Sequence, residues 1–135
     1  MESILYRSGY KYQLAKDFVI SIPVFGVEIV SLYVELSKEG KLLVLTGYAW
    51  DGLSGGCPDL KCFMRAGLVH DALCQLLREG FLPAKYKSLV HQIFLQVLRE
   101  DKVWNWVADL MWRAVSFCGD KYTYPDAIRP LHRAP

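Results

Sequence analysis

The stretch TGYAWDGLSGGCPDLKCFMRAGLVHDALC, from Thr46 to Cys74, contains the point at which the hydrophobic pattern of the chain changes. Up to Trp50 apolar and polar residues partly alternate, which is typical of a half-buried β-strand. After Asp59 the apolar residues recur at intervals of three and four, which is typical of an amphipathic helix. A glycine-rich loop separates the two patterns. The stretch therefore predicts a strand, a turn and a helix, in that order.

Three apolar segments before residue 51 predict strands, because they are rich in β-branched and aromatic residues. They are DFVISI (17–22), EIVSLYVEL (28–36) and KLLVLTGYAW (41–50). The segment SGYKYQLAKD (8–17) is a candidate edge strand. Gly40 lies in the turn between the last two apolar segments, where we expect a left-handed conformation. Pro23 is expected at the end of a strand, because it cannot donate to a sheet.

The remaining pattern predicts three helices, over residues 61–79, 83–99 and 102–118. Gly80 is expected to end the first and Pro83 to begin the second. The predicted inner stripe of the third helix consists of Val103, Trp106, Val107, Leu110, Ala114 and Phe117. Strands followed by helices predict an α+β fold: an antiparallel sheet of three or four strands with three helices packed on one side.

The size and composition predict a single globular domain over residues 1–135. Residues 1–50 are expected to form mainly strands, 61–118 the three helices and 120–135 a tail. Apolar residues make up 53% of the chain and charged residues 22%, which argues against disorder. The net charge of +2 is too small to predict nucleic-acid or membrane binding by electrostatics.

The N-terminal segment has no signal-peptide pattern, and no apolar run reaches the length of about 18 residues expected of a transmembrane helix. We therefore expect the protein to act in the cytoplasm of the cell that makes it, or as part of a particle assembled there. The four cysteines, Cys57, Cys62, Cys74 and Cys118, are expected to be free thiols, and two disulfides are the alternative. No C-x2-C pair is present, so a zinc site is less expected than a site for another cation.

His70 and Asp71 are the first candidate catalytic residues. Adjacent helix residues point about 100° apart. This places His70 on the inner face with Cys74, and Asp71 at its side. The pair predicts a cleft in which His70 acts as general base and Asp71 as a metal ligand. The alternative is a buried histidine that is hydrogen-bonded to a carbonyl, with Asp71 either exposed or acting as a cap.

The loop WDGLSGGCPD, residues 50–59, adds candidate ligands. Its glycines are Gly52, Gly55 and Gly56. Glycines permit positive φ, so that successive carbonyl oxygens can converge on an ion. Together with carboxylates from Asp51 and Asp71, these oxygens would form a hard-cation site suited to calcium or magnesium. The alternative is a turn that joins sheet to helix, with Asp59 as a helix cap.

His91 is the third candidate catalytic residue. The short connection EGFLP predicts that the first two helices are antiparallel, so residues equally distant from Gly80 should meet. His70 and Asp71 lie about ten residues before Gly80, and His91 lies about ten after it. His91 could then orient His70, share a metal with it, or act as a second acid or base. The alternative is a partly exposed histidine with aromatic neighbours.

Three tryptophans in the third predicted helix form a further group. Trp106 falls on the predicted inner stripe, whereas Trp104 and Trp112 point elsewhere. These two are candidates for an interaction surface, because exposed tryptophans often anchor partners. Packing against the fold is the alternative.

Four segments carry a resemblance to a known family: GYAWDGLSGGCPD, RAGLVHDAL, LVHQIFLQVL and ADLMWRAVSFCG. Together they resemble the phage- and prophage-associated domain-of-unknown-function family thirteen fifty-three, over residues 46–119. The family has no established activity. The resemblance implies a setting in phage genomes, often near virion or lysis genes. It implies a phage virion or host protein as partner, and a location in the host cytoplasm or the virion.

The chain departs from the family pattern at two places. Cys74 stands where the family has Tyr, and Val90-His91 stands where it has Ala-Asp. A weaker likeness links the chain to secreted phospholipases A2, which combine a glycine-rich calcium loop, a His-Asp helix and a second-helix Asp. That likeness is an analogy of mechanism.

Two functions follow from these residues. One is a small hydrolase of ester, phosphoester or cell-envelope bonds, in which His70 activates water and a divalent cation stabilises the oxyanion. The other is a non-catalytic virion or tail accessory protein, or a binder of a host factor. In that case the His-Asp pair belongs to a buried polar network that fixes the sheet to the helix.

Overall fold

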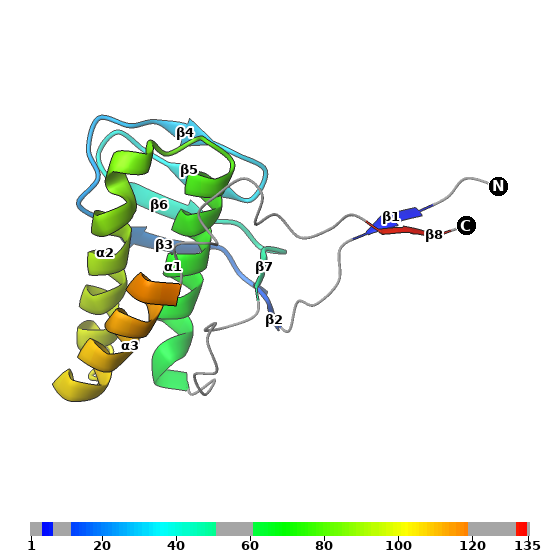
Figure 1. Cartoon of the computed structure of the whole chain (residues 1–135). Helices are drawn as coiled ribbons and strands as arrows, with labels where there is room; N and C mark the ends of the chain where they lie inside the picture. Colours follow the sequence, from blue (N-terminus) through cyan, green and yellow to red (C-terminus); the bar gives the residue numbers. More distant parts are fainter. Residues whose placement is uncertain (1–3, 7–11, 51–60, 119–131, 135) are drawn as a thin grey trace.

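The structure is a computed structural model that describes residues 4–6, 12–50, 61–118 and 132–134. Strands precede and follow the helices (Figure 1). The strands are β1 (Ile4–Tyr6), β2 (Tyr12–Gln13), β3 (Phe18–Ser21), β4 (Ile29–Val30), β5 (Val34–Leu36), β6 (Lys41–Val44), β7 (Ala49–Trp50) and β8 (His132–Ala134). The helices are α1 (Lys61–Arg78), the 3-10 turn η1 (Ala84–Tyr86), α2 (Lys87–Glu100) and α3 (Asn105–Cys118). The predicted α+β class is confirmed.

The main sheet has four antiparallel strands in the order β3-β6-β5-β4. One row of paired residues crosses all four strands on the inner face, and it consists of Ile20, Leu42, Leu36 and Ile29. The opposite face carries the alternate residues, such as the exposed Val19 and Val30. Side chains alternate between the two faces of a strand, so the period-two pattern of the sequence becomes one buried and one exposed face.

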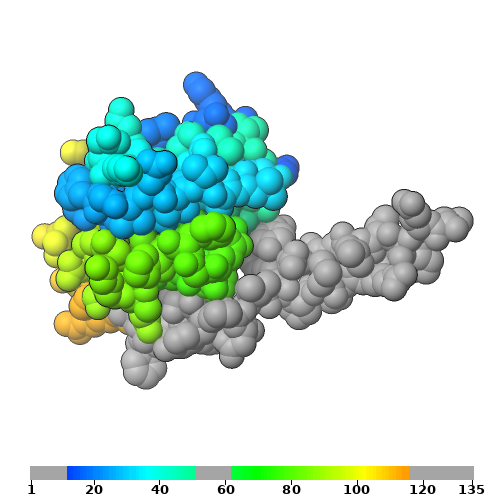
Figure 2. Space-filling model, turned by 90° about the horizontal axis from the view of Figure 1, so that it is seen from above, coloured from blue at the N-terminus to red at the C-terminus, as the bar shows by residue number. Residues whose placement is uncertain are grey.

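The helices form layers behind this sheet (Figures 1 and 2). Figure 2 shows the blue and cyan sheet, then the green of α1, and α3 on the far side from the sheet. Helix α1 is buried on nearly every side, from Ala66 to His70 and again from Ala72 to Cys74. A helix with apolar residues all round belongs in the interior of a protein. The central layer therefore contains the helix that carries His70.

The turn between α1 and α2 is close to the predicted one. Gly80 has φ +79 and ends α1. Leu82 is buried and donates its backbone N–H to the carbonyl of Leu76, which folds the chain back on α1. Pro83 precedes η1, which leads into α2. Because the connection is short, α1 and α2 pack side by side along their length.

Two of the predicted strands are interrupted. The segment 28–36 contains both β4 and β5, because Ser31 closes a turn in which its hydroxyl donates to the carbonyl of Val34 at 2.6 Å. The segment 41–50 contains both β6 and β7, because Gly47 has φ +98 and breaks the strand. β2 pairs with β7, so the candidate edge strand in 8–17 is present.

The predicted inner stripe of the third helix is partly wrong: Val103 is buried and Val107 packs against the core, as predicted, but two other members are not inside. Trp106 and Leu110 were expected inside, but they are 65% and 60% exposed. The helix begins at Asn105 rather than at 102, because Lys102 has φ +63 and interrupts the backbone. Its buried side chains are Ala108, Met111 and Val115, a stripe with a different phase.

Two further observations concern the ends of the chain and the lengths of the helices. β1 and β8 pair in antiparallel register, Ile4 opposite Ala134, so strands near the two ends of the chain lie together (Figure 1). β8 falls within the segment 120–135 that the sequence predicts as a tail. None of the helices in the described part of the chain is both long and apolar enough to cross a membrane.

Candidate functional site

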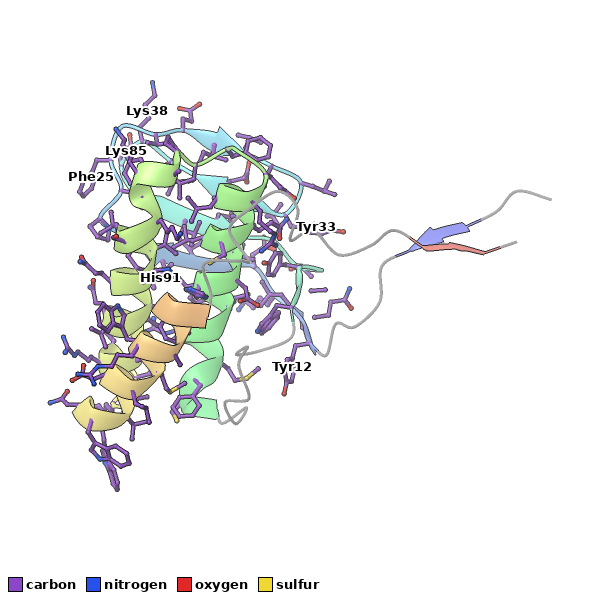
Figure 3. All side chains as sticks on the ribbon, viewed as in Figure 1. Tyr12, Phe25, Tyr33, Lys38, Lys85 and His91 are labelled. Atoms are coloured by element: carbon purple, nitrogen blue, oxygen red, sulfur yellow. The ribbon has the colours of Figure 1, made fainter. Side chains whose placement is uncertain are left out.

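The first candidate site is a cluster of buried polar side chains between α1 and α2. His70 on α1 and His91 on α2 are each 5% exposed. The antiparallel packing of the two helices brings them together, as the spacing around Gly80 predicted. Figure 3 labels His91 at the level of α2 where the two helices lie side by side. The alternative of a partly exposed His91 is therefore wrong.

The two imidazoles meet edge to edge. Nε2 of His70 lies 3.2 Å from Nδ1 of His91, so one of these nitrogens donates a hydrogen bond to the other. The ring centroids are 5.3 Å apart, and the ring of Phe94 lies 5.1 Å from that of His70 on another side. Apolar packing thus encloses a polar pair that bridges α1 and α2.

Cys74 completes the cluster. Its Sγ lies 3.5 Å from Nε2 of His70 and 3.8 Å from Nδ1. Residues four apart lie on the same face of a helix, which explains why Cys74 reaches the ring of His70 from the next turn. Cys74 is a free cysteine and is 2% exposed. The expectation of free thiols is confirmed for Cys62 and Cys74, whereas Cys57 and Cys118 lie outside the described side chains.

Asp71 lies at the margin of the cluster. Its Oδ1 is 3.9 Å from Nδ1 of His70, which is too long for a hydrogen bond but close enough for an ionic contact. The Asp71 side chain is 28% exposed, so it is the member of the pair that is nearest to solvent. Partial burial raises the pKa of Asp71, and the contact with His70 opposes that rise.

The acidic neighbours decide the protonation of His70. Burial by itself lowers the pKa of His70, because desolvation disfavours the charged ring. The interactions of His70 with Cys74 and with Asp71 act in the opposite direction and prevail. Together they raise the pKa of His70 to about 10.

A protonated His70 fixes the direction of the hydrogen bond in the cluster. Both of its ring nitrogens then carry hydrogen, so Nε2–H donates to Nδ1 of His91. A general base needs a free lone pair and a pKa near the working pH. Near neutral pH the ring of His70 meets neither condition. The cluster can hold a charge in place and join two helices, but it is poorly suited to removing a proton from a substrate.

Most residues of the predicted cation site lie outside the part of the chain that the structure describes. Asp51, Gly52, Gly55 and Gly56, with the proposed cap Asp59, lie in residues 51–60, outside the described residues. Asp71 is the predicted ligand that the structure describes. In the described ranges no group of three His, Cys, Asp or Glu side chains could hold a metal ion. Calcium, magnesium or zinc binding stays a prediction.

The second candidate site is an exposed apolar surface at the start of α3, which we call the α3 apolar patch: Trp104, Trp106 and Leu110. Trp104 is 73% exposed and Trp106 is 65% exposed. Their ring centroids are 6.4 Å apart, with the planes inclined at 41°. Leu110 follows Trp106 by four residues, so both lie on one face of α3. Large apolar side chains that cluster on a surface are typical of contact sites.

Trp112 does not belong to this patch. It is half-buried, and its Nε1 is enclosed without a hydrogen-bond partner in the described part of the chain. The candidate interaction surface therefore keeps Trp104 and gains Trp106 and Leu110. The spacing of Ala108, Met111 and Val115 could have revealed this, since it defines a buried stripe opposite to Trp106.

The family comparison covers both sites. The model of the family described as "Protein of unknown function (DUF1353)" matches residues 33–115. The chain belongs to this family. The matched region begins beside β5 and ends in α3, so it contains the histidine cluster and the α3 apolar patch. No curated protein and no solved structure matches the chain.

Membership of the DUF1353 family assigns no activity, because its description states that the function is unknown. The hydrolase hypothesis, the phage setting and the phospholipase A2 analogy thus stay predictions. Cys74 is the member of the cluster that the sequence did not single out. The spacing of four residues between His70 and Cys74 was the signal that could have identified it.

Proposed function

We propose that this protein is a non-catalytic binding protein that contacts a partner surface through the α3 apolar patch. The observation that carries the proposal is the pair of neighbouring tryptophans, 73% and 65% exposed, at the start of one helix. Tryptophan is among the residues that contribute most to binding energy in interfaces. Leaving two of them in water has no benefit for folding.

The histidine cluster supports this proposal because it suits a structural role. His70, His91 and Cys74 are all at most 5% exposed, and Nε2 of His70 lies close to both Nδ1 of His91 and Sγ of Cys74. A buried polar group that loses its partner costs about 1–3 kcal/mol, so such a cluster fixes the register of the helices that contain it. α2 in turn packs against α3, which carries the patch.

The resemblance to phage-associated sequences gives this binding function a setting. In that setting the protein would be an accessory component of a virion or tail, or a binder of a host component. The location would be the host cytoplasm or the particle itself. The patch supplies the contact in either case.

A photo-crosslinking amino acid at position 110 tests the binding function in producing cells. Its side chain would extend from the exposed face of α3. We expect a discrete adduct that disappears when Trp104→Ser and Trp106→Ser are combined. The matched control places the same amino acid at Gln92, an exposed position on α2. Absence of any adduct from position 110, or an equal adduct from position 92, would contradict the proposal.

A second candidate is the metal-dependent hydrolase, and one observation favours it. His70 contacts both Asp71 and His91: its Nδ1 lies 3.9 Å from Oδ1 of Asp71, and its Nε2 lies 3.2 Å from Nδ1 of His91. A carboxylate that contacts an imidazole is common to many hydrolytic sites. Here His70 would activate water, and Asp71 with residues 51–56 would hold a calcium or magnesium ion.

Calorimetry separates the two candidates. Metal-free protein is titrated with calcium, magnesium, manganese and zinc, and the titration is repeated with Asp71→Asn. If the protein is the hydrolase, one of these metals should bind saturably. Asp71→Asn should then weaken the metal binding about tenfold or more, because it removes the charge of one ligand. The binding protein requires no metal-dependent heat from this site.

A further inference from the structure

We infer that the α3 apolar patch docks on the surface of an anionic lipid bilayer. This inference rests on the proposed binding function and names the partner of the same patch. Its argument depends on the size of the patch, the chemistry of its side chains and the charges around it.

The patch is small compared with a typical protein interface. Trp104, Trp106 and Leu110 together expose on the order of 400 Å², given their exposed fractions and the usual area of aromatic side chains. A stable protein interface takes about 800 Å² from each partner. A second copy of this chain, bound through the same patch on both subunits, would fall short of that area. Binding to a bilayer requires no minimum contact area, since single side chains can enter it independently.

The tryptophans suit the boundary between water and lipid. An indole has an apolar body and one N–H donor, which explains the enrichment of tryptophan at both surfaces of membranes. The patch residues lie directly before α3 and in its first half, and α3 itself lies on the far side of the central helices from the sheet (Figures 1 and 2). The patch therefore faces away from the part of the fold that builds the main core.

The charges beside the patch favour an anionic surface. Lys102 and Arg113 are exposed and flank the patch along the chain, and neither has an ion-pair partner among the described residues. The nearby carboxylates form ion pairs with arginines. Arg99 contacts Asp109 at 3.4 Å, and Arg65 contacts Asp101 at 2.9 Å and Glu100 at 3.0 Å.

Within the described part of the chain, the charges beside the patch that form no ion pair are thus cationic. Each lysine or arginine near an anionic membrane adds to the attraction, and apolar side chains next to such cations are typical of interfacial helices. A nucleic acid fits less well, because two cations do not form the continuous basic groove that follows a phosphate backbone.

A comparison within the molecule provides the matched control. Val30 and Leu32, at and after β4, are 68% and 82% exposed. Their surroundings include the carboxylates of Glu28 and Glu35. This second apolar surface has similar exposure but the opposite charge, so it should not bind anionic lipid. Substitutions of Val30 and Leu32 test whether the exposure of apolar side chains is enough by itself for binding to anionic lipid.

The experiment measures partition of the full chain to vesicles by sedimentation and by tryptophan fluorescence. Vesicles of phosphatidylcholine alone are compared with vesicles that contain about 30% phosphatidylserine. We expect binding to the anionic vesicles, with a blue shift and quenching by brominated lipid. Trp104→Ser combined with Trp106→Ser should weaken the partition about tenfold or more, and Lys102→Glu with Arg113→Glu should do so as well.

The control variant, Val30→Ser with Leu32→Ser, should bind as the unchanged protein does. Circular dichroism verifies that each variant is folded. No partition to anionic vesicles, or partition that the tryptophan substitutions leave unchanged, overturns the lipid inference. If vesicles fail while position 110 still crosslinks to a protein, the inference falls and the proposed binding function stands. If both fail, both are wrong.

Discussion

Nε2 of His70 lies 3.2 Å from Nδ1 of His91, in the interior of the protein and between two antiparallel helices. Each imidazole contacts an imidazole of the neighbouring helix. The contact therefore depends on the relative position of α1 and α2, and it reports on that position. It also occupies the nitrogen of His70 that a catalytic role would need.

The contact predicts energetic coupling between the two histidines. We expect His70→Ala and His91→Ala each to reduce the free energy of unfolding by about 2–4 kcal/mol, because each leaves a cavity and a buried partner atom unsatisfied. The double variant should cost at least about 1 kcal/mol less than the sum of the single ones. Urea unfolding measures all four proteins.

A control cycle combines His70→Ala with Gln92→Ala, which is exposed on α2. Those two changes should be additive within about 0.5 kcal/mol. Additivity in the His70 and His91 cycle would show that the imidazoles do not interact in solution.

The raised pKa of His70 predicts a loss of stability at alkaline pH. The folded protein holds the His70 proton up to a pKa of about 10, whereas the ordinary value is 6.5. The contribution of protonated His70 to the free energy of unfolding is therefore complete below about pH 6.5 and disappears as the pH rises toward 10. We expect the free energy of unfolding to fall over this range, and to fall less in His70→Gln.

Cys74→Ala tests the cause of that shift. Removing the acidic neighbour should lower the pKa of His70 and move the loss of stability toward neutral pH. Urea unfolding between pH 6 and pH 10 measures both variants. Equal pH dependence in the unchanged protein and His70→Gln would refute a raised pKa.

Gly40 predicts a large backbone effect in the turn before β6. It has φ +87, and an added Cβ would overlap the carbonyl oxygen of Ile22. Gly40→Ala should therefore destabilise the protein by about 2–4 kcal/mol, through positive φ and the clash together. Gly26→Ala is the matched control, since Gly26 has φ +78 with nothing within 4 Å. It should cost only about 1–2 kcal/mol in thermal or urea unfolding. Similar costs at both glycines would show that the close approach to Ile22 is absent.

The ion pairs of Arg65 should link α1 to the end of α2, with a strength that depends on the salt concentration. Its Nε donates to both carboxylate oxygens of Asp101 at 3.1 Å, and Nη2 donates to Glu100 at 3.0 Å. Asp101 raises the pKa of Arg65. The group is partly exposed, so we expect Arg65→Ala to cost about 1 kcal/mol at low salt and clearly less at high salt.

Arg99→Ala is the comparison for this network. It removes the more exposed and longer contact with Asp109, 3.4 Å, and should cost less than about 0.5 kcal/mol. Unfolding at two salt concentrations distinguishes the two arginines. An effect of Arg65→Ala that does not change with salt would mean that packing, not charge, is lost.

Much of the fold could be predicted because it depends on local pattern. Alternation placed the strands, and the periods of three and four residues placed the helices. The breaks at Ser31 and Gly47 were missed, because a turn inside an apolar run leaves the run apolar. The facing of His70 and His91 was predicted correctly, since a short connection leaves two helices little choice but to run antiparallel.

The sequence by itself determined which residue types share a face and in which order the elements follow one another. The tertiary structure decided what each face contacts. Only the packing of α1 against α2 made His70 and His91 buried partners of each other. Likewise, the packing of α3 against α2 leaves Trp106 on the exposed side of its helix. Periodicity fixes the angles between side chains on one helix, but the neighbouring layers fix how that helix is rotated.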